Sequence, residues 1–200
     1  MYWFMSQFKS AYDKAYEVLK TISFQFKMMV STADVLKAVE KLTNIDIKYT
    51  EFDFAELDNA EGKERFSRFG AAMYVSPEGD NREARILLNS RETIEMQRFS
   101  LVHELGHLML NNMQRMDEGF LFSTHIDMDI TSISEEALKG DDFAIGEQAA
   151  NIFALLVLIP DELLVKALKN YDSLDDIAKA FGVEKSAVVS RVMLGIKKEA

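Results

Sequence analysis

The spacing of apolar residues predicts helices at the start of the chain. Between residues 2 and 20, aromatic and aliphatic side chains recur three or four positions apart, which is the period of one helical face. STADVLKAVEKLT, residues 31–43, repeats that period, and Ser31 or Thr32 can cap its amino end. Two helices are therefore expected before the pattern changes.

The pattern then changes to the alternation of half-buried strands. IDIKYTEFDF (45–54), RFGAAMYV (68–75) and EARILLN (83–89) each predict a strand, and a turn-rich connector joins the last two. The polar stretch 55–65 predicts a loop. We expect a small antiparallel sheet.

Helical spacing returns after the strands. Ser90 or Thr93 can cap a long helix that continues to about Asn112. The pattern over residues 114–146 is weak, and a long excursion of this kind within a compact domain is usually functional or mobile. It separates the long helix from the helices that follow.

The remaining chain predicts four more helical segments. EQAANIFALLVLI (147–159) is almost wholly apolar and stops at Pro160, and DELLVKALKN (161–170) follows. SLDDIAKAFGVEKSAVVSRVML (173–194) predicts a helical hairpin with a tight turn at Gly182. Helices, then a small sheet, then helices indicate the α+β class.

This order suggests three parts that pack as one unit. Residues 1–30 form a helical extension, residues 31–165 a core, and residues 166–200 a C-terminal helical hairpin. We expect the aromatic start, Tyr2-Trp3-Phe4, to pack against the core or to form a self-association contact, and the pattern leaves the oligomeric state open.

Composition narrows the functions that fit. The net charge of −10 disfavours a nucleic-acid partner, and the absence of cysteine excludes disulfides, thiolate metal sites and cysteine nucleophiles. The start lacks the basic-then-apolar order of a signal peptide, and the longest apolar run, Ile152–Ile159, is too short to span a bilayer. We expect a soluble, cytoplasmic protein without a membrane partner.

The segment SLVHELGHLML carries the clearest chemistry. His103 and His107 are four residues apart, so on a helix both imidazoles face one point and can bind one metal ion. Glu104 lies beside them and can act as a general base on a water molecule. The alternative is a chance pattern on a buried helix, but buried polar side chains need partners and a metal supplies one.

Two histidines leave a third protein ligand to be found. The H-E-x-x-H-x-x-G-x-x-H pattern fails because positions 110 and 113 are Leu and Met. A carboxylate in the first turn of the apolar helix, Glu147, would be costly if buried without a partner, and a metal removes that cost. Asn151, one turn later, could then orient a ligand histidine. Two alternatives remain: His125 as the ligand, or Glu147 in an exposed first turn favoured by the helix dipole.

Other groups could assist catalysis. His125, Tyr74 and Tyr171 are candidates for stabilising an oxyanion or contacting substrate. Strand 71–76 or strand 83–89 could hold an extended substrate by edge pairing.

The C-terminal hairpin has the spacing of a helix-turn-helix at Ala178, Gly182 and Val188. Residues 171–200 carry equal numbers of acidic and basic side chains, so this segment offers few phosphate contacts. We expect a packed hairpin that closes the domain and no DNA binding.

Together these segments resemble the ImmA/IrrE family of gluzincin-like zinc metallopeptidases. The resemblance covers about residues 31–190. It rests on a strand that ends in Asn, an R-F-[ST]-x-x-H-E-x-G-H helix, and an E-x-x-A-N-x-F-A helix that ends in proline. The matching positions are Asn89, Arg98, Phe99, Ser100, His103, Glu104, Gly106, His107, Glu147, Ala150, Asn151, Phe153, Ala154 and Pro160.

The resemblance implies one zinc ion per chain, with His103, His107 and Glu147 as ligands and Glu104 as catalytic base. It also implies a narrow-specificity endopeptidase that cleaves a helix-turn-helix repressor in a prophage, mobile element or stress response. The alternative is a non-proteolytic, metal-bound regulator or a toxin–antitoxin-like partner, which would have no need of Glu104. Residues 1–30 and 114–146 depart from the family pattern, and we expect them to affect specificity.

Overall fold

The computed structural model describes residues 2–22, 28–57, 69–76, 82–110, 120–124 and 141–195. Its helices are α1 (Tyr2–Thr21), α2 (Thr32–Thr43), α3 (Ile94–Leu110), α5 (Asp142–Leu158), α6 (Asp161–Asn170), α7 (Leu174–Phe181) and α8 (Lys185–Leu194). Its strands are β1 (Asp46–Phe52), β2 (Phe69–Val75), β3 (Glu83–Asn89) and β4 (Phe120–Thr124), and a short 3-10 helix spans Phe54–Leu57. The predicted α+β class is confirmed.

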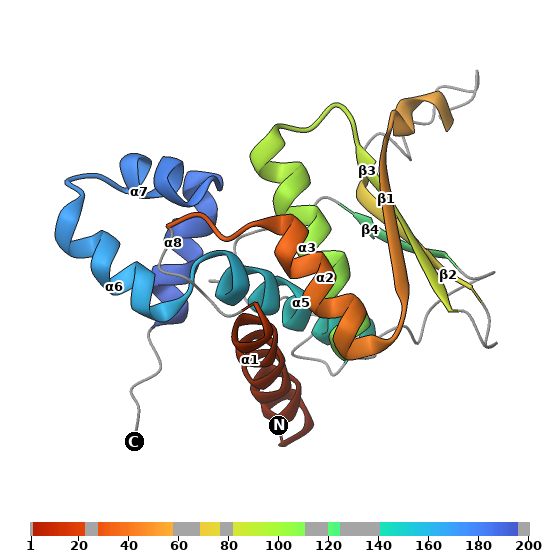
Figure 1. The fold of residues 1–200 in the computed structure, drawn as a ribbon, viewed down its shortest axis with the longest axis horizontal. Helices are drawn as coiled ribbons and strands as arrows, with labels where there is room; N and C mark the ends of the chain where they lie inside the picture. The colour runs from red at the N-terminus through yellow and green to blue at the C-terminus, as the bar shows by residue number, and fades with distance from the viewer. Residues whose placement is uncertain are drawn as a thin grey trace.

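The elements are arranged around the helices α2, α3 and α5. Figure 1 shows the sheet on one side of α2, α3 and α5, and the helices α6, α7 and α8 on the other. We call α6, α7 and α8 the helical lobe. Among the described helices, none is both long and apolar enough to cross a membrane.

The sheet is mixed, with the strand order β1-β3-β2-β4. β2 pairs antiparallel with β3 and with β4, but β1 runs parallel to β3. The expectation of a wholly antiparallel sheet is therefore wrong for β1. β2 and β3 each have a partner on both sides, so the suggestion that strand 71–76 or strand 83–89 offers a free edge to substrate is also wrong.

Side chains at the helix starts set where the helices begin. The Ser31 hydroxyl accepts a hydrogen bond from the amide of Asp34, which confirms the predicted cap of α2. The Thr93 hydroxyl does the same for Met96 at the start of α3. Asp141 accepts from the amides of Phe143 and Ala144, so α5 begins well before the predicted start at residue 147.

One face of the sheet belongs to the core. Alternation places the buried side chains of β2 and β3 on this face, and they pack in one cluster with those of α3 and α5; the sheet residues are Ala71, Met73, Val75, Ala84, Ile86 and Leu88. The opposite face carries charged side chains, among them Lys48, whose ammonium lies 2.6 Å from a Glu83 carboxylate oxygen. Only one face of the sheet therefore packs against α3 and α5.

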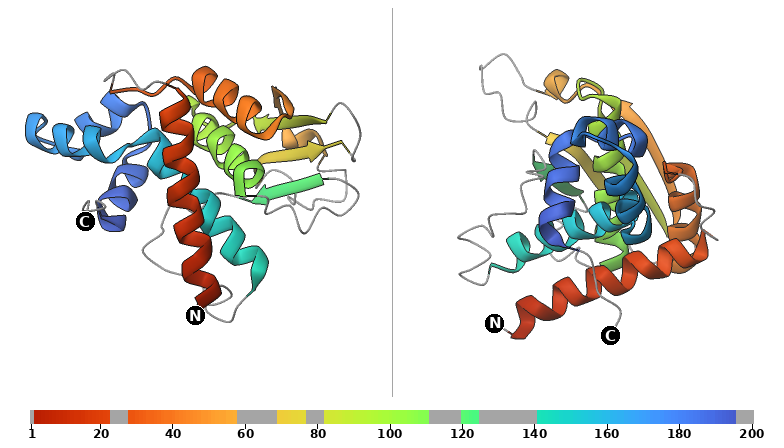
Figure 2. Two further views of the ribbon diagram at one scale, coloured as in Figure 1. Left: turned by 60° about the horizontal axis from the view of Figure 1, so that its bottom comes forward. Right: turned by 90° about the vertical axis from the view of Figure 1, so that its left-hand side faces the viewer.

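Helix α1 contributes to the same core. Figure 2 shows α1 lying across α5, and Ala11, Ala15 and Val18 are fully buried. Two small side chains allow this close approach. The side chains of the aromatic start, Tyr2-Trp3-Phe4, lie outside the described part of the chain, as do residues 58–65 of the predicted loop.

The predicted hairpin α7–α8 is present, with Gly182 in a left-handed conformation (φ 62°) at its turn. Arg98 on α3 donates hydrogen bonds to the carbonyls of Phe181 and Gly182, and also to that of Val30. The Thr93 hydroxyl donates to Glu184 at the start of α8. The turn and the start of α8, which a DNA-binding helix-turn-helix would present to DNA, are thus held against α3.

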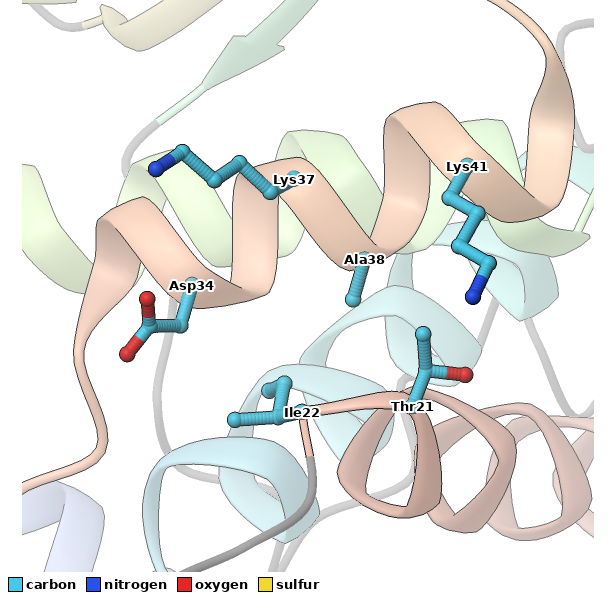
Figure 3. A pocket seen from close by; sticks show the side chains of 6 residues that line it. All are labelled: Thr21, Ile22, Asp34, Lys37, Ala38 and Lys41. Carbon is cyan, nitrogen blue, oxygen red and sulfur yellow. The ribbon is translucent and has the colours of Figure 1, made fainter.

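A small pocket of about 230 Å³ lies where α1 ends beside α2 (Figure 3). Its lining residues are Thr21, Ile22, Asp34, Lys37, Ala38 and Lys41. Ile22 and Ala38 face each other across it, whereas the amine of Lys37 points away. This pocket contains none of the predicted site residues.

Candidate metal centre

Helix α3 brings the two histidines together. His103 and His107 are buried, with exposed fractions of 0% and 1%, and their Nε2 atoms lie 2.9 Å apart. Because side chains on a helix lean towards its amino end, the ring of His107 extends back over that of His103. Both rings thus direct Nε2 at one point, as the four-residue spacing predicts.

Helix α5 supplies a carboxylate to that point. One carboxylate oxygen of Glu147 lies 3.1 Å from Nε2 of His107, and the other lies 3.4 Å from Nε2 of His103. One ligand atom from each of the three residues lies within 4.8 Å of the other two. Glu147 sits in the second turn of α5, not in an exposed first turn, because Asp141 starts the helix earlier.

Gly106 sets the distance between the two helices. A Cβ atom at this position would lie 3.0 Å from Cδ1 of Phe153 and 3.3 Å from the backbone of Ala150 on α5. The absence of a side chain therefore lets α3 and α5 approach closely. This contact lies between His103 and His107 on one helix and beside Asn151 on the other.

Asn151 orients the first histidine. Its Oδ1 atom lies 2.8 Å from Nδ1 of His103. An amide oxygen only accepts, so Nδ1 of His103 carries the proton and the lone pair of Nε2 faces Glu147. This is the tautomer that a metal ligand requires.

The donor set fits a divalent cation. Two imidazole nitrogens and a carboxylate converge in a buried place, and neutral lone pairs at this separation repel unless a proton or a metal ion lies between them. Two histidines with one carboxylate is a ligand set used by catalytic zinc sites, which keep a further position open. The three residues therefore form a possible metal site.

Charges within the cluster shift its protonation in the metal-free state. Burial alone would lower the pKa of His103, but hydrogen bonding and charge attraction from Glu147, with the charge of Glu104, raise it above its ordinary value of 6.5. Burial alone would raise the pKa of Glu147, but the charge of His107 and hydrogen bonds from both histidines hold it well below its ordinary value. The opposite charges of the histidines and of Glu147 therefore favour the charged form of each group.

Glu104 is fully buried on the same stretch of α3. Its charge contributes to the raised pKa of His103, so the carboxylate lies close to the ligand histidines.

Two of the other predicted contacts, Tyr74 and Tyr171, do not join this cluster. Tyr74 pairs with Arg85 across β2 and β3, on the face of the sheet opposite to α3. Tyr171 follows α6, which leaves from the carboxyl end of α5, whereas Glu147 lies in the amino-terminal half of that helix. His125 lies outside the described residues.

One buried polar residue on the face of α3 that carries the two histidines was not among the predicted site residues. Ser100 has no exposed surface and lies one turn before Glu104 on α3. The signal was available, because positions 100, 103, 104 and 107 follow the spacing of a single helical face.

Comparison with known proteins agrees with this geometry. A search of curated proteins found no match to the chain. The sequence model of the peptidase family M78, described as the IrrE N-terminal-like domain, matches residues 63–193, which is more than half of the chain. This range contains α3 and α5 with all three candidate ligands, and it begins after α1, α2 and β1. The chain therefore belongs to the IrrE N-terminal-like family of peptidases.

Proposed function

We propose that this protein is a cytoplasmic, zinc-dependent endopeptidase of narrow specificity. The observation that carries the proposal is the convergence of His103, His107 and Glu147 within 4.8 Å, with the buried Glu104 on the same helix. Membership of a peptidase family supports a protein as the substrate. We propose a helix-turn-helix repressor of a prophage or mobile element as that protein.

In this proposal each residue has one task. His103, His107 and Glu147 hold zinc, and Asn151 fixes the orientation of His103. When bound, zinc supplies Lewis acidity and lowers the pKa of water towards neutrality. Glu104 accepts the proton of the water that attacks the peptide carbonyl and then delivers it to the departing amine.

A cleavage assay on a purified helix-turn-helix repressor, chosen from the genes beside the one for this protein, tests the proposal. The Glu104→Gln variant should bind one zinc per chain and cut nothing, because an amide cannot accept the proton. Glu95→Gln, an exposed position on the same helix, is the matched control and should cut at the wild-type rate. Cleavage by zinc-loaded Glu104→Gln would overturn the mechanism.

The third ligand has its own test. Glu147→Ala should lose zinc under conditions where the wild type holds it. Unchanged zinc affinity in this variant would remove Glu147 from the ligand set and leave His125 as the remaining candidate. Tight repressor binding without cleavage by the wild type would instead support the alternative of a metal-bound regulator.

A further inference from the structure

Helix α8 carries apolar side chains on both of its faces. Ala187 and Val188 are fully buried on the inward face. On the outward face, Val189, Val192 and Met193 keep 36%, 42% and 64% of their surface exposed. Residues three and four apart are neighbours on a helix, so these three form one row, which we call the α8 row. A helix that is apolar all round is usually covered all round, so the α8 row calls for a partner.

The other two helices of the helical lobe have the outward faces of ordinary solvated helices. Helix α7 exposes Asp175, Asp176 and Lys179. Helix α6 exposes one apolar side chain, Leu168, next to the exposed Lys169. Single exposed apolar residues are normal on protein surfaces, whereas contiguous ones mark interaction sites. The α8 row is therefore the feature of the lobe that needs an explanation.

The charges around the α8 row favour a protein as its partner. Between residues 185 and 195, the exposed basic side chain is Lys185, and its ammonium lies 2.7 Å from a carboxylate oxygen of Asp175. Nucleic acids and anionic membrane surfaces are bound through several free basic side chains, which this face does not offer. An uncharged, apolar patch on another protein is the surface that matches the row.

The size of the α8 row favours a transient partner over a permanent one. A stable interface buries roughly 800 Å² on each partner, and three partly exposed side chains supply only a fraction of that area. The ion pair of Lys185 with Asp175 and the charged outward face of α7 limit its extension on one side. A small apolar centre with a charged rim fits a contact that forms and breaks, as an enzyme requires of a substrate that it must release.

The α8 row and the metal centre are attached to the same helix. The Thr93 hydroxyl donates a hydrogen bond to Glu184 at the start of α8, and Arg98 donates to two carbonyls of the turn between α7 and α8. Both residues precede His103 on the segment that forms α3. A protein bound at the row would therefore be held in a defined position relative to the metal centre, which limits the peptide bonds that can reach it.

We infer that the α8 row, Val189, Val192 and Met193, is a docking surface that binds an apolar patch of the substrate protein away from the bond to be cut. The inference rests on the proposed function and deepens it. Recognition at α8 as well as at the metal centre gives a narrow specificity its physical basis, because a substrate must satisfy both places at once.

Binding of the purified helix-turn-helix repressor of the cleavage assay tests the inference. Full-length, zinc-loaded Glu104→Gln protein is suitable, because in the proposed function it binds the repressor without cutting it. Adding Val192→Gln and Met193→Gln together should weaken repressor binding about tenfold, with zinc still at one per chain. Leu168→Gln, which removes an exposed apolar side chain from α6, is the matched control and should leave binding unchanged.

Cleavage gives a second measurement in the protein that retains Glu104. The paired change on α8 should raise KM for the repressor and leave kcat unchanged, because a docking contact is the same in the bound substrate and in the transition state. A lower kcat with unchanged KM would overturn the docking role, since it would show that α8 acts on the chemical step.

The outcomes separate the docking surface from the proposed function. Equal repressor affinity with and without the paired change would overturn the docking surface and leave the peptidase proposal in place. A wild type that binds the repressor through the α8 row but never cuts it would overturn the proposed function and support the docking surface. Light scattering that shows a wild-type dimer, converted to a monomer by the paired change, would assign the row to a second copy of the chain and overturn the inference.

Discussion

The helical lobe and the metal centre both bury charged side chains, but they satisfy them differently. In the lobe, Arg191 has no exposed surface, and its guanidinium donates to the carbonyls of Ile159 and Gly195 and to the carboxylate of Asp161. In the metal centre, two ring nitrogens and a carboxylate converge on one another. Within the described part of the chain, Nδ1 of His107 has no hydrogen-bond partner.

This difference separates a structural group from a functional one. A buried cation that directs each of its three nitrogens at a protein oxygen has little capacity left for a ligand. A cluster whose acceptors face one another is stable only with a proton or a metal ion between them. Burial alone therefore does not identify a site, whereas the balance of donors and acceptors does.

The largest expected effect is on the lobe. Arg191→Met should lower the free energy of unfolding by about 3–5 kcal/mol, because it removes the charged donor that Asp161 and the carbonyls of Ile159 and Gly195 share. Urea denaturation of the metal-free protein would measure it. Arg85→Met, on the exposed face of the sheet, is the control and should leave the unfolding curve nearly unchanged. An undisturbed midpoint in Arg191→Met would contradict the structural role.

A smaller effect is expected on the metal centre. Asn151→Ala should weaken zinc binding by about 10–100-fold, because Nδ1 of His103 loses the acceptor that fixes its tautomer. Competition with a fluorescent chelator would measure the affinity. Asn170→Ala, at the end of α6, should bind zinc like the wild type. Equal affinity in the two variants would show that Asn151 does not orient the ligand.

The last expected effect is a dependence on pH, which we expect for the metal centre and not for the helical lobe. The raised pKa of His103 means that its ion pair with Glu147 stabilises the metal-free protein fully below its ordinary value of 6.5, and that this contribution is lost as pH rises through the raised value. The lowered pKa of Glu147 means that its contribution is present above its ordinary value of 4.5 and is lost as pH falls through the lowered one.

Zinc must displace the proton of His103, so its affinity should fall about tenfold for each pH unit below the raised pKa. Chelator competition between about pH 6 and about pH 8 would measure this slope. The contribution of Arg191, measured as the difference in unfolding free energy between wild type and Arg191→Met, should not change over this interval. A flat zinc affinity would show that no proton is displaced.

The sequence predicted those elements whose pattern is local. The cap at Ser31, the helix of the two histidines and the turn at Gly182 each follow from neighbouring residues. Strand β4 was missed because FLFST is short, and its pairing with β2 joins segments far apart in the chain. The parallel pairing of β1 with β3 is non-local in the same way.

The site shows the same division. His103 and His107 follow from a four-residue spacing, and Glu147 from the cost of burying a carboxylate on an apolar helix. Tyr74 was misplaced because the face that a strand residue occupies depends on which face the helices cover. Arg191 carries no local signal of burial, since arginine is mostly exposed and only tertiary partners reveal the exceptions.

The packing of α1 across α5 has a consequence for protein synthesis. A ribosome releases α1 first, but the helix that covers its apolar side begins only at Asp142. His103 and His107 emerge before that partner and before Glu147. A centre with three protein ligands therefore cannot close before Glu147 has left the ribosome, so in the proposed function the nascent chain stays inactive until α5 has been made.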